Sequence, residues 1–330
     1  MINVRNIFPR YFNISEENGI ARYIQCKHVS VNFSKSETTD ILWEKHDTTI
    51  QNMKLYDIKP ENTLLDLKIE LASRMFRECS FCERKCRVDK AKESGNCGVQ
   101  QPAIASEFLH LGEESVLIPS YTVFFSGCTF HCVFCQNWDI SQRNAGIFIK
   151  PAILVKMIQE RKNQGARNVN WVGGDPTPNI LYILETLKNC DVNIPQIWNS
   201  NMYCSKETIK LLNGIIDLYL TDFKYGNDKC AQRLSKVDNY MDIIKRNHRI
   251  VEKNGEMIIR HLVMPNHIEC CSKSILRWIA DNIPNIPVNI MDQYRPDYFA
   301  KNYQDISYSV SSEEIRAVEA IAKKLQIISL

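Results

Sequence analysis

Three cysteines at close and regular spacing are the residues of this sequence most suited to chemistry. Cys128, Cys132 and Cys135 follow Gly127 in the pattern C-x3-C-x2-C. Three thiolates on one short loop can ligate three corners of a cubane iron–sulfur cluster, which leaves the fourth iron without a protein ligand. The alternatives are a zinc knuckle or a chance group of cysteines. A zinc site needs four ligands, and His131 lies too close between the cysteines to complete one easily.

A second group of cysteines precedes the first. Cys79, Cys82, Cys86 and Cys97 form a complete set of four thiolates with the spacing C-x2-C-x3-C-x10-C. Four sulfurs permit a closed zinc or mononuclear iron site, or a fully ligated auxiliary cluster, and thiolate softness does not choose among them. The loop within this group is basic, which suits contact with RNA or an acidic partner, but a solvated surface is favoured. The sequence therefore predicts a second metal centre whose metal is zinc, iron or an iron–sulfur cluster.

The composition sets the class of protein in which these sites occur. The chain has 330 residues, 44% apolar and 24% charged, with a formal net charge of +3 and 13 cysteines. Clustered cysteines without a signal peptide favour metal ligation over disulfides. The small net charge gives no general argument for binding nucleic acid, and no segment has about 18 successive apolar residues that could cross a membrane. We expect a cytoplasmic protein that does not bind membranes.

Short apolar segments alternate with amphipathic ones from about residue 121 onward. The segments that read as strands are 121–127, 168–174, 194–200, 215–223, 256–264 and 286–292. Strands that alternate with helices predict right-handed βαβ units and a parallel sheet, either open or curled into a barrel. In such folds the ligand site lies at the C-terminal ends of the strands, where polar and glycine-rich residues of this sequence gather.

Four segments are expected along the chain. They are an N-terminal extension (1–75), a four-cysteine metal-binding segment (76–118), an α/β domain (119–300) and a C-terminal helix (301–330). Residues 1–70 are polar with weak periodicity, and we expect one helix there, at 63–76. Because the predicted domain leaves a side opening, the extension could fold over it as a docking element or lid. Adjacent Cys270 and Cys271 are interpreted as isolated, buried or inert thiols.

The stretch FFSGCTFHCVFCQNWDIS, which carries the three-cysteine loop, resembles the cluster loop of radical S-adenosylmethionine (SAM) enzymes. Phe134 supplies the aromatic residue of their C-x3-C-x-aromatic-C pattern. Over about residues 76 to 300 the sequence is most similar to an activase-like branch related to pyruvate formate-lyase activating enzyme. The resemblance implies a partial (β/α)6 TIM-type barrel behind the N-terminal cysteine-rich extension. It also implies a [4Fe–4S] cluster whose open iron binds SAM, so that one electron cleaves SAM to methionine and a 5′-deoxyadenosyl radical.

Further motifs extend the resemblance to the expected SAM site. The segment WVGGDPTP resembles the family's Gly-Gly-Glu motif, with Asp175 in place of glutamate, and Asp222 to Lys224 resembles its Asp-x-Lys segment. Helix capping, a plain salt bridge and core packing are the alternative roles of these polar residues. The residues that the resemblance implies for contact with SAM or substrate are Phe134, Gly173, Gly174, Asp175, Thr177, Ser200, Asn201, Asp222, Lys224, Arg260 and His267.

These motifs predict an anaerobic radical SAM enzyme acting on a protein or peptide, as a glycyl-radical activase or a peptide-modifying enzyme. The resemblance also implies an electron donor of the ferredoxin or flavodoxin type. A radical SAM enzyme acting on RNA or a small cofactor precursor is the alternative within the same class. An iron–sulfur electron-transfer or metal-sensing protein is the alternative of another class. That alternative predicts no SAM motif, so the GGDPTP segment argues against it.

Overall fold

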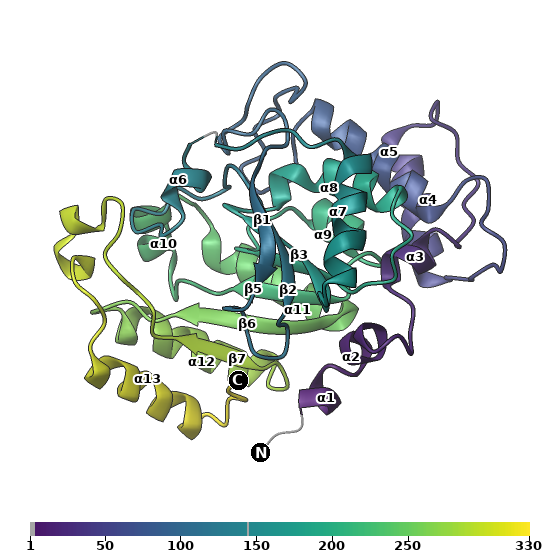
Figure 1. The fold of residues 1–330 in the computed structure, drawn as a ribbon. Helices are drawn as coiled ribbons and strands as arrows, with labels where there is room; N and C mark the ends of the chain where they lie inside the picture. The colour runs from purple at the N-terminus through teal and green to yellow at the C-terminus, as the bar shows by residue number, and fades with distance from the viewer. Residues whose placement is uncertain (1–3, 144) are drawn as a thin grey trace.

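A seven-stranded sheet forms the centre of the protein in the computed structural model, which describes residues 4–143 and 145–330 (Figure 1). The strands lie in chain order, β1-β2-β3-β4-β5-β6-β7. Strand β1 pairs with β2 in antiparallel orientation, and β2 to β7 pair in parallel. The bounds are Ile104–His110 (β1), Ser120–Phe125 (β2), Asn168–Gly173 (β3), Gln196–Ser200 (β4), Leu218–Asp222 (β5), Glu256–Leu262 (β6) and Val288–Met291 (β7).

The sheet confirms the predicted fold class. All six predicted strands are present as the parallel strands β2 to β7, and strands β1 and β7 remain as edges of an open sheet. This arrangement is a partial (β/α)6 barrel, because a closed barrel would pair its first and last strands. Strand β1 was not predicted. Apart from Ile104 its residues are half-buried or exposed, so it lacks the apolar run of a central strand.

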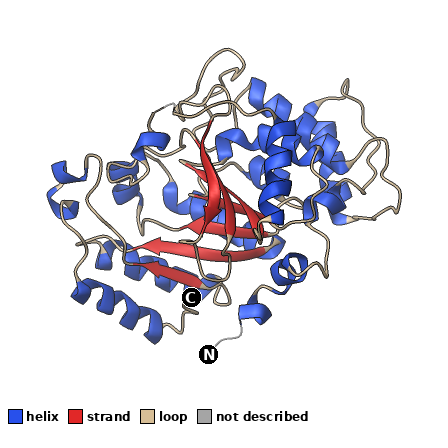
Figure 2. Cartoon of the chain, viewed as in Figure 1, coloured by secondary structure: helices blue, strands red, loops and turns tan. Residues whose placement is uncertain are grey.

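Helices connect successive parallel strands and form an outer layer around the sheet (Figures 1 and 2). Helix α7 (Pro151–Asn163) leads to β3, α8 (Ile180–Lys188) to β4, and α9 (Lys206–Leu212) to β5. Helices α10 (Asp228–Ser235) and α11 (Tyr240–Asn254) both precede β6. Helix α12 (Lys273–Asn282) leads to β7. The remaining short or C-terminal elements are α6 (Trp138–Ser141), η1 (Thr177–Asn179), η2 (Ile268–Ser272), η3 (Ala300–Asn302), η4 (Gln304–Ile306) and α13 (Ser312–Lys324). No helix in the described part of the chain is long and apolar enough to span a membrane.

The N-terminal extension holds more helices than expected. Helix α5 (Leu64–Arg77) confirms the one that was predicted, and it begins with a capping box between Thr63 and Asp66. Four others precede it: α1 (Val4–Ile7), α2 (Pro9–Ser15), α3 (Arg22–Cys26) and α4 (Thr39–Gln51). The expectation of a single helix was wrong, because three of these span at most seven residues and their periodicity is too short to detect.

The described part of the extension makes polar contacts at the N-terminal ends of the strands. Its expected role as a docking element or lid over the side opening stays a prediction. The backbone N–H groups of Arg10 and Tyr11 donate to Glu256, the first residue of β6, at 2.7 and 2.9 Å. The backbone N–H of Arg22 donates to Asp217, just before β5, at 3.0 Å. The extension therefore closes the N-terminal end of the sheet.

A small apolar cluster completes this closure. Phe8 and Tyr11 from the extension, and Val116 and Leu117 from the β1–β2 connection, are buried together with residues of three central strands. Those strand residues are Ile197, Leu218, Leu220 and Ile258. A closed barrel fills its interior with its own side chains. Here the N-terminal extension and the β1–β2 connection supply part of the side chains that fill the interior of the sheet. They do so at the N-terminal ends of the strands and leave space at the C-terminal ends.

Candidate functional site

A cavity of about 460 Å³ lies at the C-terminal ends of the parallel strands. Eleven of the residues predicted for the site line it: Cys128, Cys132, Phe134, Cys135, Gly173, Gly174, Ser200, Asn201, Asp222, Lys224 and Arg260. The sequence placed each after or near the end of a strand, and parallel strands bring those ends to one edge of a sheet. The roles of these residues stay predictions at this point, but their convergence is a property of the fold.

The three cysteines of the C-x3-C-x2-C loop lie between β2 and α6. The sulfur of Cys128 lies 3.4 Å from the carbonyl oxygen of Gly174 and accepts the backbone N–H of Phe130 at 3.3 Å. Burial raises the pKa of all three thiols, that of Cys132 to about 12. A cationic iron centre would reverse this, because ligation stabilises the thiolate.

Helix α10 supports the same loop from behind. The backbone N–H groups of His131 and Val133 donate to the carbonyl oxygens of Ser235 and Leu234, at 3.0 and 2.9 Å. The hydroxyl of Ser235 also lies 2.9 Å from the sulfur of Cys132. The C-terminal turn of α10 therefore fixes both the backbone and one thiol of the loop.

Gly173 and Gly174 are required by close backbone packing. A Cβ at Gly173, whose φ is +127°, would lie 2.1 Å from the carbonyl oxygen of Phe125. A Cβ at Gly174 would lie 2.1 Å from the carbonyl oxygen of Gly127. No side chain fits at these distances. The two glycines therefore let the end of β3 lie directly against the start of the cysteine loop.

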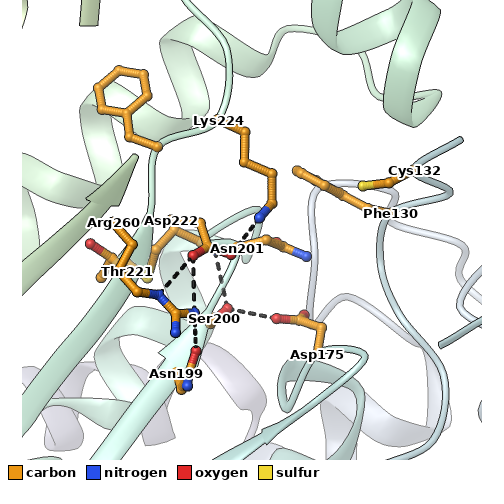
Figure 3. A network of polar contacts seen from close by, with 12 residues as sticks. Phe130, Cys132, Asp175, Asn199, Ser200, Asn201, Thr221, Asp222, Lys224 and Arg260 are labelled. Carbon is orange, nitrogen blue, oxygen red and sulfur yellow. Dashed lines mark hydrogen bonds and ion pairs between the residues drawn. The ribbon is translucent and has the colours of Figure 1, made fainter. Parts of the chain in front are cut away.

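Asp175 is fully buried and organises the polar residues around it. Its carboxylate accepts hydrogen bonds from Ser200 at 2.7 Å and Thr129 at 3.2 Å, and Figure 3 shows the contact with Ser200. Asn201 donates to the hydroxyl of Thr129 at 2.9 Å. Burial raises the pKa of Asp175 to about 6, although these hydrogen bonds oppose the rise. Asp175 thus joins the ends of β3 and β4 to the cysteine loop.

A charged group occupies the ends of β5 and β6 (Figure 3). The carboxylate of Asp222 accepts a hydrogen bond from the ammonium group of Lys224 at 2.7 Å and one from the guanidinium of Arg260 at 3.1 Å. Burial alone would raise the pKa of Asp222. The two neighbouring cations outweigh burial, so the pKa lies below its ordinary value. The two cations thus lie at the strand ends beside the cysteine loop, where their N–H groups can donate hydrogen bonds to an anionic ligand group.

Two acidic residues of the cavity were missed by the sequence analysis. Glu113 and Glu114 belong to the β1–β2 connection, which reaches the cavity beside the strands. Glu113 lies 3.6 Å from Arg260 and accepts a hydrogen bond from Asn170 at 3.2 Å, and Glu114 accepts one from Asn289 at 2.9 Å. In the sequence, the only feature that marks these two residues is an acidic pair before an apolar strand. Such pairs are common on protein surfaces.

Three of the residues predicted to contact SAM or substrate lie outside the cavity lining. Asp175 and Thr177 are buried next to Gly174, in the segment that leads into η1. His267 is buried near Arg233, whose guanidinium lies 3.3 Å from its Nε2 atom, and near Asp305 at 3.6 Å. Direct contact with a ligand in the cavity is therefore better supported for the other members of the set.

The four-cysteine group packs beside the three-cysteine loop. Cys79, Cys82 and Cys97 are buried, and Cys86 is half-buried. The backbone N–H of Cys128 donates to the carbonyl oxygen of Cys97 at 3.3 Å. Burial raises the pKa of Cys79 and of Cys82. The structure thus places the two cysteine groups next to each other, while the metal centre at the first group stays a prediction.

Comparison with known proteins agrees with this site. A family model described as the radical SAM superfamily matches residues 122–279. An uncharacterised protein of Methanocaldococcus jannaschii is 46% identical over 333 residues, which cover 96% of this chain and 97% of the relative. The chain belongs to the radical SAM superfamily. The family implies a [4Fe–4S] cluster and SAM as cofactors.

Activating enzymes are similar to part of the chain. Pyruvate formate-lyase 1-activating enzyme of Escherichia coli is 24% identical over 151 residues, which cover 44% of this chain and 61% of the relative. The match therefore spans less than two thirds of that enzyme. Among solved structures, a domain of pyruvate-formate lyase-activating enzyme from Bacteroides vulgatus has a TM-score of 0.41 at 19% identity and covers 49% of this chain and 97% of that one. Streptococcus suis SuiB bound to precursor peptide SuiA has a TM-score of 0.45 at 15% identity and covers 88% of this chain and 60% of that one.

The residues of the cavity fit the cofactors of the family. Three thiols converge on one cavity and supply the soft ligands that an iron–sulfur cluster needs. Bare glycine backbone and the cationic donors Lys224 and Arg260 line the same cavity. In addition, the buried Oε2 atom of Glu114, which lines the cavity, has no hydrogen-bond partner among the described residues, and this leaves an acceptor for a polar ligand.

Proposed function

We propose that this protein reductively cleaves SAM at a [4Fe–4S] cluster held by Cys128, Cys132 and Cys135, and that the product radical abstracts hydrogen from a protein or peptide. The observation that carries this proposal is the meeting of these thiols with the strand-end residues of β3 to β6 in one cavity. When bound, the reduced cluster supplies the electron that breaks a C–S bond of SAM, which gives methionine and the 5′-deoxyadenosyl radical.

The residues around the cavity then bind and orient SAM. Gly173 and Gly174 line the cavity without side chains, so that their backbone can approach the amino group of SAM. Lys224 and Arg260 offer cationic donors to its carboxylate, while Asp222 holds both cations in place. Ser200 and Asn201 present hydroxyl and amide groups from the end of β4. Asp175 and Thr177 act through this network as positioning residues rather than by direct contact.

The role of Lys224 can be tested by binding. Lys224→Met removes one charge-assisted hydrogen bond, which is worth about 1.5–3 kcal/mol, so the Kd for SAM should rise roughly 10- to 100-fold. Isothermal titration of the anaerobically reconstituted enzyme with SAM measures this change. Lys206→Met is the matched control, because Lys206 is exposed at the start of α9. Equal Kd values for both variants would contradict the assignment of Lys224.

A second metal centre at Cys79, Cys82, Cys86 and Cys97 is part of the proposal. The backbone contact between Cys97 and Cys128 would couple its stability to that of the cluster loop. The triple variant Cys128→Ala, Cys132→Ala, Cys135→Ala should retain zinc or iron, and adding Cys86→Ser and Cys97→Ser should lower the metal content by about one centre. Elemental analysis of the two folded variants makes the comparison. Identical metal contents would exclude a centre at these cysteines.

The substrate class rests on the partial similarity to an activating enzyme, whose name states that it activates another protein. Near the cysteine loop, the indole of Trp138 stacks on Tyr298, and Phe299 is exposed beside them. Such aromatic surface suits the docking of a polypeptide segment. A ferredoxin- or flavodoxin-type protein would supply the electron.

Deuterium transfer tests the substrate class. The enzyme is incubated anaerobically with SAM and with fractions of host material grown in deuterated medium, and 5′-deoxyadenosine is analysed by mass spectrometry. We expect deuterium in this product with the protein fraction, and loss of the signal after that fraction is digested with protease. Label that appears solely with the RNA or small-molecule fraction would favour the alternative substrate classes and overturn the peptide proposal.

A further inference from the structure

Three cysteines outside both predicted metal sites meet in the folded protein. Cys230 lies in the first turn of α10, and Cys270 and Cys271 lie in the π-helical turn η2. The sulfur of Cys270 lies 3.7 Å from that of Cys271 and 4.0 Å from that of Cys230, and all three lie within 4.8 Å of one another. Within the described residues, no other trio of cysteine, histidine or carboxylate ligands lies so close. The interpretation of Cys270 and Cys271 as isolated thiols was wrong, because the fold adds Cys230.

The backbone around these thiols is built for close approach. A Cβ at Gly226 would lie 2.6 Å from the carbonyl oxygen of Cys270 and 2.7 Å from the Cα of Cys271. The side chain of Asn227 donates to the carbonyl oxygen of Cys270 at 2.9 Å and accepts the backbone N–H of Cys230 at 2.8 Å. One asparagine therefore fixes both elements that carry the cysteines, next to a glycine that permits their contact.

The distances between the sulfurs match the needs of a single metal ion. Thiolates bound to one tetrahedral zinc ion at about 2.3 Å lie about 3.8 Å apart, close to the observed 3.7 and 4.0 Å. Thiolates that ligate different iron atoms of a cubane cluster are separated further, by the width of the cluster. The sulfurs are also farther apart than the roughly 2.05 Å of a disulfide bond. The geometry is thus that of a mononuclear thiolate site.

Basic side chains lie beside these sulfurs, and His267 forms a hydrogen bond with Cys230. Nδ1 of His267 lies 2.8 Å from the carbonyl oxygen of Pro265, which fixes the ring with Nε2 directed away from that bond. The guanidinium of Arg233 lies 3.3 Å from this Nε2 atom and adds positive charge nearby. Cys230 and Cys271 are buried, while Cys270 is exposed and gives an ion a path of entry.

We propose that Cys230, Cys270 and Cys271 bind one zinc ion as thiolates, with His267 or a water molecule as the fourth ligand. Binding exchanges thiol protons for the metal and transfers no electrons. This site lies outside the SAM cavity and goes beyond the proposed function. Zinc at this place would join the start of α10 to η2, and the other end of α10 holds the cluster loop through Leu234 and Ser235. The ion would therefore stabilise the support of the cluster loop.

Zinc content and cobalt spectroscopy of the full-length protein test the site. Wild-type protein purified anaerobically with a non-thiol reductant should hold about one zinc per chain more than Cys270→Ser or Cys230→Ser. Cobalt in its place should show the thiolate charge-transfer and intense d–d bands of tetrahedral coordination, weakened in both variants. Cys270 is exposed, so its replacement should not prevent folding. Cys26→Ser is the matched control, because Cys26 is a buried thiol outside the cluster.

Thermal unfolding gives an independent measure. Zinc added after chelation should raise the Tm of the wild type and of Cys26→Ser by more than that of Cys230→Ser, which lacks this site, since an ion bound solely to the folded state stabilises it. Equal zinc content in wild type and both cluster variants would overturn the proposal. A disulfide between any two of these three cysteines in the anaerobically purified wild type, found by mass spectrometry in place of zinc, would overturn it as well.

Discussion

Replacing Cys132 by alanine is expected to lower reductive cleavage of SAM below detection. Cys132 is the middle ligand of the proposed cluster, and its sulfur is buried 2.9 Å from the Ser235 hydroxyl that fixes its position. With one ligand removed, a second iron loses its protein ligand, and the cluster is no longer held in one orientation towards SAM. The measurement is the yield of 5′-deoxyadenosine from anaerobically reconstituted, dithionite-reduced protein, together with its iron and sulfide content.

The control for this variant is Cys190→Ala. Cys190 is as buried as Cys132 but lies after α8, next to Tyr23 rather than the cavity. Its loss should affect the free energy of unfolding without abolishing SAM cleavage. Undiminished 5′-deoxyadenosine formation by the folded Cys132→Ala variant would contradict the assignment of the cluster to this loop.

Gly173→Ala is expected to have the second-largest effect. The new Cβ would lie 2.1 Å from the carbonyl oxygen and 2.2 Å from the nitrogen of Phe125, and φ at this position is +127°. Backbone atoms of a central strand cannot move aside as a flexible side chain can. Strain and overpacking together should lower the free energy of unfolding by about 3 kcal/mol or more. The cysteine loop starts directly after Phe125, so we also expect loss of SAM cleavage in whatever protein folds.

Gly165→Ala separates steric overlap from backbone strain. Gly165 also has a positive φ of +98°, but a Cβ there would meet no atom of the described residues within 4 Å. The substitution should cost about 1 kcal/mol and leave SAM cleavage intact. Denaturant unfolding compares the two variants. Similar losses of stability would mean that conformation alone, and not the contact with Phe125, requires glycine at position 173.

The parts of the site that could be predicted from the sequence are those encoded locally. The three cysteines of the cluster loop lie within eight residues, and Gly173, Ser200 and Asp222 each end a strand whose apolar run is visible in the sequence. Since parallel strands align their ends, these local signals were sufficient to place the residues on one edge of the sheet.

The parts that were missed depend on contacts between distant segments. Glu113 enters the cavity because the β1–β2 connection folds toward Asn170 and Arg260, and nothing local marks that path. The contacts of the extension were not predicted either, because Arg10 and Arg22 find their acidic partners far along the chain, at the starts of β5 and β6. Cys230 and Cys271 are separated by a whole strand and helix, so their meeting becomes visible only in the folded protein.

The closure of the sheet by the N-terminal extension has a consequence for the order in which the protein can assemble. Arg10 and its partner Glu256 are separated by 246 residues, so the segment around Arg10 is synthesised long before the strand that it contacts. During synthesis the apolar side chains of Phe8 and Tyr11 have no place to be buried. Contacts of such long sequence separation slow folding and expose nascent chains to aggregation and proteolysis. We therefore expect docking of helices α1 to α3 against the sheet to be a late step of folding.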